Sequence, residues 1–375
     1  NNLLVWVYLQ EKNFNSALEQ LIAIDKRIGF YEHEIFDLGD ISISNLNLDI
    51  AQKAFNYLIK KGDHSIYYEE SILKIMDVQY LIFKNNPINK KSEITEIITA
   101  FKSTINLLGE KNETTLVIRD LAHVLAFYQK NLEEAKKILR SILEKKNYSN
   151  ENLAYIKIEL ADILISENKI WDAILYYSQV EKEFKNDIIG QEAKFKKVQV
   201  DYYNGDFNWA QAQLDILKKS TSKLISNNAI ELSLLITDNL NLDTTQIALS
   251  LYAKAELLMF QKNYNEANKI FENIQSLFPN HTLIDEILFK KATIETAKKE
   301  YAKALNYLDQ ICNIYAHDSI LFDDALYQQG YILETIIKDK TKAKEKYEEL
   351  LLEQPGSIFL AETRKRYRKL RSQSE

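Results

Sequence analysis

The stretch of sequence that decides the fold recurs along the chain: residues 264–274 read YNEANKIFENI, and residues 301–311 read YAKALNYLDQI. Each begins with an aromatic residue and has alanine at its fourth position, as do residues 14–17 (FNSA) and 207–210 (FNWA). Residues 170–173 (IWDA) and 132–135 (LEEA) are close variants. Self-similarity of this kind indicates a repeat protein.

Aligning the chain on this alanine extends the repeat over nearly its whole length. Four residues after the alanine stands a large apolar or aromatic residue, with Thr104 as the exception, and seven residues after it stands Ile, Leu or Val. These spacings place the side chains on one face of an amphipathic helix. Most intervals between the alanines are 34 to 39 residues. The aligned residues are Ala17, Ala51, Ala100, Ala135, Ala173, Ala210, Ala267, Ala304 and Ala343.

A small residue precedes the alanine by twelve positions in several repeats. The residues are Gly39, Ala161, Ala255 and Ala292, with Gly330 displaced by one position. We therefore expect each repeat to be two antiparallel helices that cross closely at the small residue and the alanine, since larger side chains would push the axes apart. Neighbouring pairs then stack to bury a continuous core.

The composition favours long helices with short connections. The 375 residues include only eight Gly and three Pro, and 46% are apolar. The formal net charge of −6 argues against nucleic acid as the main partner, because phosphate binding needs a basic surface. The single cysteine, Cys312, lies in an apolar helical run and is expected to be a buried, inert thiol.

Two long intervals interrupt the regular spacing. Ala51 to Ala100 spans 49 residues, and Ala210 to Ala267 spans 57 because it includes an extra apolar helix near 227–239. We predict one continuous array over residues 1–375, without a separate linker. Its expected parts are divergent repeats at 1–112, regular repeats at 113–222, an inserted helix at 223–245, regular repeats at 246–353 and a basic capping helix at 354–375.

The repeat resembles the tetratricopeptide repeat (TPR) family, including the proline after the second helix in Phe278-Pro279-Asn280 and Gln354-Pro355-Gly356. The consensus tryptophan of the first helix is absent. The resemblance implies an all-α, right-handed α-solenoid of about nine helix-turn-helix repeats that binds proteins.

A narrower resemblance concerns the last third of the chain. Residues 278–289 and 323–330 are similar to repeats of bacterial envelope TPR proteins, such as the lipoprotein subunit of the outer-membrane β-barrel assembly machinery and the Tol-associated periplasmic coordinator. Residues 354–368 resemble the ends of Bacteroidetes-type TPR proteins. This implies a scaffold in the periplasm or at the outer membrane.

The sequence offers no residues for an enzyme, and we expect no catalytic residue, metal or cofactor. It contains no Gly-rich phosphate loop, and its five histidines and one cysteine have no zinc-ligand spacing. The acidic pairs Asp285-Glu286 and Asp323-Asp324 fall at the expected starts of first helices. Negative charge there offsets the helix dipole, which explains the pairs without acid–base catalysis.

The resemblance places partner contacts on the first helices, which line the concave surface of TPR arrays. Equivalent positions on these helices carry apolar and aromatic side chains, which suit a groove for a peptide or helix. The alternative is that these side chains pack between neighbouring repeats. The predicted groove residues are Phe127, Tyr155, Ile158, Phe195, Tyr202, Tyr252, Phe289 and Tyr327.

The C-terminal segment is strongly basic. It either binds an anionic partner or is the solvated face of a terminal helix whose inner face is Ala361, Tyr367 and Leu370. Its basic residues are Arg364, Lys365, Arg366, Arg368, Lys369 and Arg371.

Three functions are compatible with these patterns. The first is a protein-interaction scaffold of a bacterial envelope assembly. The second is a cytoplasmic regulator that binds peptide or nucleic acid through the basic helix, and the third is a non-catalytic subunit tethered to an enzyme. No apolar run approaches the ~20 residues of a membrane span. The chain starts at Asn1 without Met, and residues 3–7 resemble a first solenoid helix rather than the remains of a signal peptide.

Overall fold

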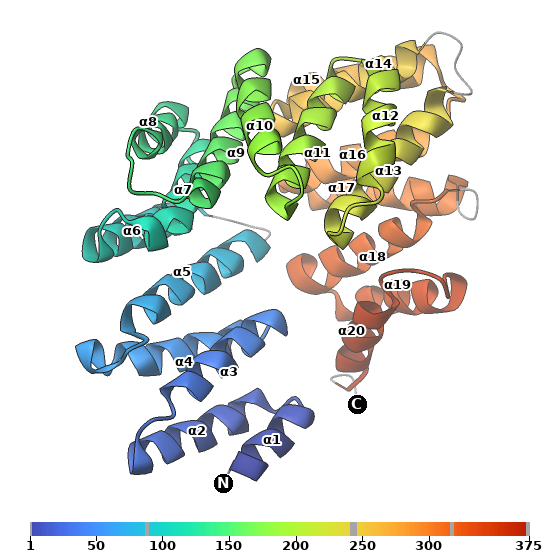
Figure 1. Cartoon of the computed structure of the whole chain (residues 1–375). Coiled ribbons are helices and arrows are strands. Elements are labelled where there is room, and N and C mark those ends of the chain that lie inside the picture. Colours follow the sequence, from blue (N-terminus) through green and yellow to red (C-terminus); the bar gives the residue numbers. More distant parts are fainter. Residues whose placement is uncertain (1, 87–89, 241–245, 316–318, 373–375) are drawn as a thin grey trace. The chain divides into compact units, whose positions relative to one another are not determined.

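The computed structural model describes residues 2–86, 90–240, 246–315 and 319–372, and these residues form helices without any strand (Figure 1). The predicted all-α class is confirmed. By its internal contacts the chain divides into two compact units, Asn1–Ile163 and Leu164–Glu375, with the boundary inside α9. The continuity of one array across both units stays a prediction.

Unit 1 contains consecutive helix pairs in the order that the repeat predicts. Short 3₁₀ turns (η1, η2) and a wide π-turn (η3) join or extend them. Its elements are α1 (Asn2–Gln10), α2 (Phe14–Ile28), α3 (Glu32–Ser44), α4 (Leu48–Ile59), η1 (Gly62–His64), α5 (Tyr68–Asn85), α6 (Lys91–Leu108), η2 (Asn112–Thr114), α7 (Thr115–His123), η3 (Val124–Tyr128), α8 (Leu132–Leu143) and α9 (Asn150–Ser166).

Unit 2 contains further pairs, the predicted inserted helix α13 and the predicted basic helix α20. Residues 241–245 and 373–375, at the ends of those two predicted segments, lie outside the described residues. The elements are α10 (Ile170–Glu183), α11 (Ile188–Tyr203), α12 (Phe207–Leu217), α13 (Lys223–Leu240), α14 (Ile247–Phe260), α15 (Tyr264–Leu277), α16 (Ile284–Ala297), α17 (Tyr301–Gln310), the π-turn η4 (Ile311–Tyr315), α18 (Phe322–Ile332), the π-turn η6 (Leu333–Ile337), α19 (Lys340–Glu353) and α20 (Leu360–Ser372).

The close crossing of paired helices is confirmed for eight of the nine aligned alanines, because every one except Ala100 is 0% exposed. The glycines on the partner helices show how tight the crossing is. A Cβ atom added to Gly39 would lie 2.5 Å from the ring of Phe55, and one added to Gly330 would overlap the ring of Tyr347. Both rings stand four residues after an aligned alanine.

The alignment of Ala100 is wrong by three residues. The buried face of α6 includes Ile97, Phe101 and Thr104, whereas Ala100 is half-buried and Leu107 is 62% exposed. Ile97 therefore occupies the position that alanine fills elsewhere.

The other eight pairs share a turn with a left-handed residue five positions before the alanine. This residue has a positive φ, and the second helix of the pair begins two residues after it. In α6 the equivalent position, five residues before Ile97, is Ser92, which lies inside the helix. The left-handed residues are Lys12, Leu46, Lys130, Asn168, Gly205, Lys262, Lys299 and Lys338.

Wide π-turns explain why Gly330 stands one position out of register. A π-turn holds one more residue than an α-helical turn, and η6 follows Gly330 before the chain reaches Ala343. The same displacement occurs before Ala135, where η3 intervenes and the buried Ala122 stands thirteen positions earlier. A fixed spacing of twelve positions before the alanine therefore does not identify Ala122.

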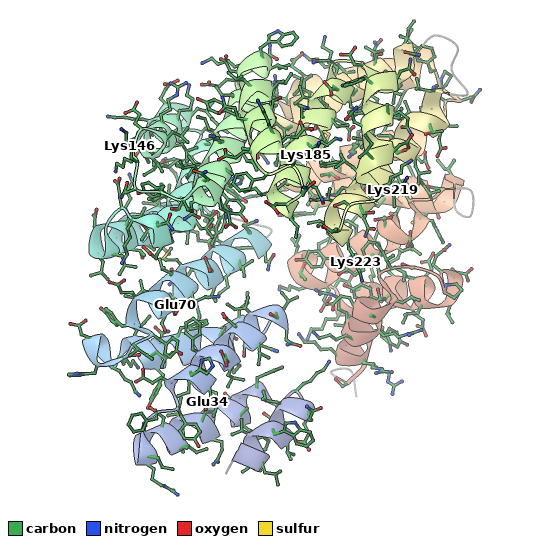
Figure 2. All side chains as sticks on the ribbon, viewed as in Figure 1. Glu34, Glu70, Lys146, Lys185, Lys219 and Lys223 are labelled. Carbon is green, nitrogen blue, oxygen red and sulfur yellow. The ribbon has the colours of Figure 1, made fainter. Side chains whose placement is uncertain are left out.

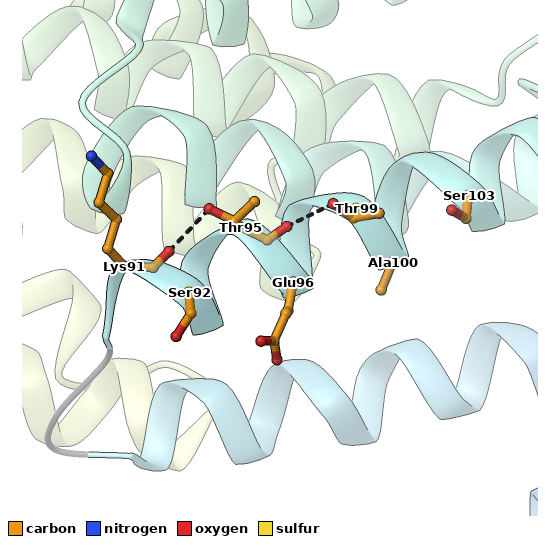
Figure 3. Close-up of a pocket in the computed structure, with 7 residues that line it drawn as sticks. All are labelled: Lys91, Ser92, Thr95, Glu96, Thr99, Ala100 and Ser103. Atoms are coloured by element: carbon orange, nitrogen blue, oxygen red, sulfur yellow. Dashed lines mark hydrogen bonds between the residues drawn. The ribbon is translucent and has the colours of Figure 1, made fainter.

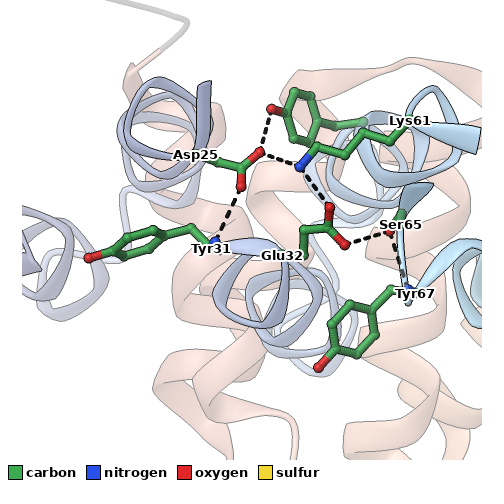
Figure 4. A network of polar contacts seen from close by, with 7 residues as sticks. Asp25, Tyr31, Glu32, Lys61, Ser65 and Tyr67 are labelled. Carbon is green, nitrogen blue, oxygen red and sulfur yellow. Dashed lines mark hydrogen bonds and ion pairs between the residues drawn. The ribbon is translucent and has the colours of Figure 1, made fainter. Parts of the chain in front are cut away.

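A buried ion-pair network ties α2, α3 and α4 together in unit 1 (Figure 4). Asp25 accepts hydrogen bonds from Tyr57 Oη at 2.7 Å and from the backbone N–H of Tyr31 at 3.2 Å. Lys61 Nζ lies 2.5 Å from Asp25 and 2.8 Å from Glu32. Burial raises the pKa of Asp25, but these donors outweigh it, and the pKa is lowered overall.

Several first helices begin with acidic residues. Glu34 in α3 and Glu70 in α5 are exposed, as Figure 2 shows. Asp285-Glu286 and Asp323-Asp324 lie in the first turns of α16 and α18, the positions that the sequence predicted.

Candidate protein-interaction surface

Half of the predicted groove residues are buried. Ile158 and Phe195 are 6% and 8% exposed, and Tyr202 and Tyr252 are each 1% exposed. The ring of Tyr252 lies 5.7 Å from that of Phe271 in the paired helix α15. These four side chains pack between helices, as the alternative interpretation predicts. Partner binding by them stays a prediction.

The other four predicted groove residues are half-buried. Phe127 lies 4.7 Å from the ring of His123, and Tyr155 lies beneath the guanidinium of Arg119 at 5.8 Å. Tyr327 stacks on Phe359 at 4.5 Å. The fourth, Phe289, packs against the core of unit 2. Partner binding by these four residues stays a prediction.

Unit 2 also has a polar cluster that the sequence analysis did not assemble. Glu256 accepts a hydrogen bond from Tyr202 Oη at 2.7 Å, and Lys290 Nζ lies 2.7 Å from its other oxygen. The three residues come from α11, α14 and α16. The three residues are far apart in sequence, so no local spacing predicts the cluster, although each residue lies on a first helix.

Glu286, in the first turn of α16, is kept neutral at pH 7. Burial raises its pKa to about 9, and the neighbouring Asp285 and, from α13, Asp238 add to this rise. Its oxygen Oε2 is buried and has no hydrogen-bond partner among the described residues. A charge that only offset the helix dipole would not be buried in this way, so the dipole interpretation does not account for Glu286.

Asp324 occupies the equivalent place in α18. Burial raises its pKa to about 7, and Asp323 and Glu231 of α13 act in the same direction. We call six acidic residues of α13, α14, α16 and α18 the acidic face. These residues are Glu231, Glu256, Asp285, Glu286, Asp323 and Asp324.

Unit 1 carries carboxylates on its first helices as well, but these are largely paired. Arg119 lies 2.6 Å from Asp120, and His123 Nδ1 lies 2.9 Å from Glu159. Asp120 and Glu159 are each 7% exposed. Burial and the nearby Asp120 raise the pKa of Asp77 to about 6. This network is mainly structural.

The basic helix α20 divides into two faces. Arg366 belongs to the fold, because it lies 2.8 Å from Glu334 and 3.0 Å from Glu362. The predicted inner face is partly wrong, since Ala361 is exposed while Thr363 is buried with Leu370. The other five basic residues are exposed: Arg364, Lys365, Arg368, Lys369 and Arg371.

Other groups give no support for chemistry. Cys312 is 8% exposed, and burial raises the pKa of its thiol to about 12, which makes it unreactive. Within the described residues, no three His, Cys, Asp or Glu side chains gather as a metal site would require. The described helices also include none long and apolar enough to cross a membrane.

A hollow of 760 Å³ runs along α6, lined by side chains of that helix alone (Figure 3). The hydroxyls of Thr95 and Thr99 donate to backbone carbonyls of α6 at 3.0 and 2.8 Å. Their donors are thus used within the helix. Ala100, which is half-buried, is one of the residues that line it.

Residues 249–281 and 324–357 match the family model described as tetratricopeptide repeat. The two segments correspond to α14–α15 and α18–α19 and contain Tyr252, Glu256, Asp324 and Tyr327. The chain therefore carries tetratricopeptide repeats, and the predicted resemblance is confirmed. Repeats of this class generally bind other proteins.

Several solved structures are similar to this chain. A tetratricopeptide repeat protein from Parabacteroides merdae is 14% identical, with a TM-score of 0.32, and 80% of this chain and 98% of that one are covered. The C-terminal part of a TPR repeat-containing protein from Cytophaga hutchinsonii is 18% identical, with a TM-score of 0.29 and coverage of 77% and 98%. A human IFIT1 dimer with m7Gppp-AAAA is 12% identical, with a TM-score of 0.41 and coverage of 93% and 80%. These likenesses are too distant to carry a functional argument. No curated protein matches.

Proposed function

We propose that this protein is a non-catalytic scaffold that organises a bacterial cell-envelope assembly by binding proteins on its first helices. The presence of tetratricopeptide repeats supports protein binding. The observation that carries the proposal is the surface of α16 and α18, where Phe289 and Tyr327 are half-buried and each follows an acidic residue by three positions. Half-buried aromatic rings are common anchors of protein interfaces. The envelope location rests on the resemblance of the last third of the chain.

The test is chemical crosslinking in the native organism, followed by mass spectrometry. The wild type is compared with a Phe289→Ala/Tyr327→Ala variant. A Trp171→Ala/Leu175→Ala variant is the matched control, since these side chains are 81% and 57% exposed on the second helix α10. We expect envelope proteins to be captured by the wild type and the control and lost with the first variant. An unchanged list in the first variant overturns the proposed surface.

The exposed cations of α20 favour a second candidate, a cytoplasmic regulator that binds peptide or nucleic acid through this helix. An Arg364→Glu/Lys365→Glu/Arg368→Glu variant tests it in the same experiment. Loss of cytoplasmic partners or nucleic acid in this variant, with no envelope protein captured by the wild type, would replace the first proposal by the second.

A further inference from the structure

The outer side of α20 exposes positive charge alone. Its one carboxylate, Glu362, is half-buried and lies 3.0 Å from Arg366. Four cations of the helix are exposed, and the described residues offer none of them an ion pair. We call these four the cationic face, and they are Arg364, Lys365, Arg368 and Lys369.

Solubility alone does not explain the cationic face. The adjacent helix α19 exposes lysines and glutamates together. On α20, like charges stand four residues apart, Arg364 with Arg368 and Lys365 with Lys369. Like charges at this spacing are neighbours on the surface of a helix and destabilise it. An anion bound to the face would relieve this repulsion.

Contacts on the inner side of α20 hold the cationic face outward. Leu370 is 4% exposed and packs in a cluster with Tyr347. Thr363 is buried as well, and Arg366 lies 2.8 Å from Glu334. The cations on the exposed side can therefore meet a partner without a rearrangement of the fold.

An exposed aliphatic side chain stands directly before these cations in the chain. Ile358, in the turn that leads into α20, is 87% exposed. A lipid surface accepts both kinds of side chain, since cations bind its headgroup phosphates and aliphatic groups enter the boundary of the acyl chains. Single-stranded nucleic acid gains from exposed aromatic rings. The one aromatic residue of α20, Tyr367, is half-buried and donates a hydrogen bond to Glu348.

We propose that the cationic face binds an anionic phospholipid membrane, with Ile358 inserted among the headgroups. Each guanidinium group donates two parallel hydrogen bonds to a phosphate, and the lysines add point charges. The 13 residues of α20 give a helix about 20 Å long, which can lie along a membrane surface.

The experiment is flotation of the full chain with phosphatidylcholine vesicles that contain either no anionic lipid or about one third phosphatidylglycerol. We expect binding to the anionic vesicles at about 50 mM salt and its loss at about 500 mM salt, because ions screen the charges. Each cation near an anionic membrane contributes about fivefold in affinity. Arg364→Gln/Lys365→Gln/Arg368→Gln should therefore bind about a hundredfold more weakly.

Two matched controls remove the same groups elsewhere. Lys185→Gln/Lys219→Gln/Lys223→Gln neutralises three exposed lysines of unit 2 and should bind as the wild type does (Figure 2). Ile358→Ser should weaken binding about fivefold, since the inserted side chain is lost. Ile66→Ser, at a side chain of unit 1 that is 85% exposed, should leave binding unchanged.

Thermal denaturation without lipid distinguishes a binding face from a structural one. Because the glutamine variant of α20 relieves the repulsion between Arg364 and Arg368, it should unfold at the wild-type temperature or above it. A lower Tm would show that these cations belong to the fold, which overturns the inference.

Absence of binding to anionic vesicles, equal binding to both kinds of vesicle, or an equal loss in the lysine control each overturns the inference. Unchanged binding by Ile358→Ser overturns the insertion of that side chain. Binding of a single-stranded oligonucleotide through Arg364, Lys365 and Arg368, without binding of vesicles, replaces the membrane by the second candidate function. Phe289 and Tyr327 take no part here, so failure of this inference leaves the scaffold proposal standing.

Discussion

Asp25 in unit 1 is buried, and Glu286 in unit 2 is half-buried with one buried oxygen, and the pKa values of their carboxyl groups are shifted in opposite directions. Asp25 is 5% exposed, yet the hydrogen bonds from Tyr57, Tyr31 and Lys61 lower its pKa. Glu286 has a buried oxygen that finds no hydrogen-bond partner within the described part of the chain, and its pKa is raised to about 9. Burial therefore does not decide what a carboxyl group does. The donors around it do, because they replace the hydration that burial removes.

The difference separates a carboxylate that is satisfied by donors from one that is not. The carboxylate of Asp25 joins three helices and accepts from three donors. The Oε2 of Glu286 is buried, and the described residues supply no donor to it.

The largest effect is expected at the close crossings of paired helices, one in each unit. Ala51→Phe in unit 1 and Ala304→Phe in unit 2 should each lower the free energy of unfolding by about 3 kcal/mol, because both alanines are 0% exposed and the helices must separate. Urea denaturation measures this loss. Ala100→Phe is the control, and it should change stability by less than about 0.5 kcal/mol. An equal loss in the control would restore Ala100 to the crossing position.

Removing the charge of Asp25 should destabilise the protein. Asp25→Asn should lower the free energy of unfolding by about 2 kcal/mol at pH 7, since Lys61 loses a buried partner that is 2.5 Å away. The lowered pKa means that this contribution is present above the pKa of the unfolded chain and is lost as the pH falls through the folded value. Asp37→Asn, at an exposed ion pair, serves as the control. Equal stability of Asp25→Asn and wild type at pH 7 would contradict the structural role.

Replacing the titratable carboxyl group of Glu286 should have the opposite effect on stability. Because its folded pKa is raised to about 9, the wild type is expected to lose stability as the pH rises from about 4.5 towards 9. Glu286→Gln should raise the free energy of unfolding by about 1 kcal/mol at pH 7 and flatten this pH dependence. Denaturation at pH 5, 7 and 9 measures both. A variant less stable than wild type at pH 9 would mean that the carboxylate is already satisfied.

The smallest effect concerns the left-handed turns of the neighbouring helix pairs. Leu46 has φ 59° and Lys299 has φ 68°, a region that glycine adopts without strain. Leu46→Gly and Lys299→Gly should each raise the free energy of unfolding by about 0.5 kcal/mol. Thermal denaturation measures the gain, and Gly205→Ala, at φ 86°, should show a loss of similar size. Destabilisation by either glycine would mean that its side chain contributes more than the backbone strain.

Much of this protein follows from local periodicity. The helix pairs, the buried alanines at their crossings and the extra helix α13 were predicted from the sequence, because side chains three and four positions apart must share a helix face wherever that helix packs. The same argument placed the two acidic pairs in the first turns of α16 and α18. The predicted register was wrong in α6, where Ile97 stands in place of the alanine. The fixed spacing also did not identify Ala122, because a π-turn adds a residue before Ala135.

Tertiary structure decided which side chains are covered. Tyr252 and Phe289 occupy equivalent positions on first helices, yet one is buried and the other half-buried, because each neighbouring helix covers a different part of the surface. Tertiary structure also brought together Glu231, Glu256, Glu286 and Asp324 from four helices. Pairing and burial of charges depend on contacts between residues far apart in sequence, and no local spacing records them.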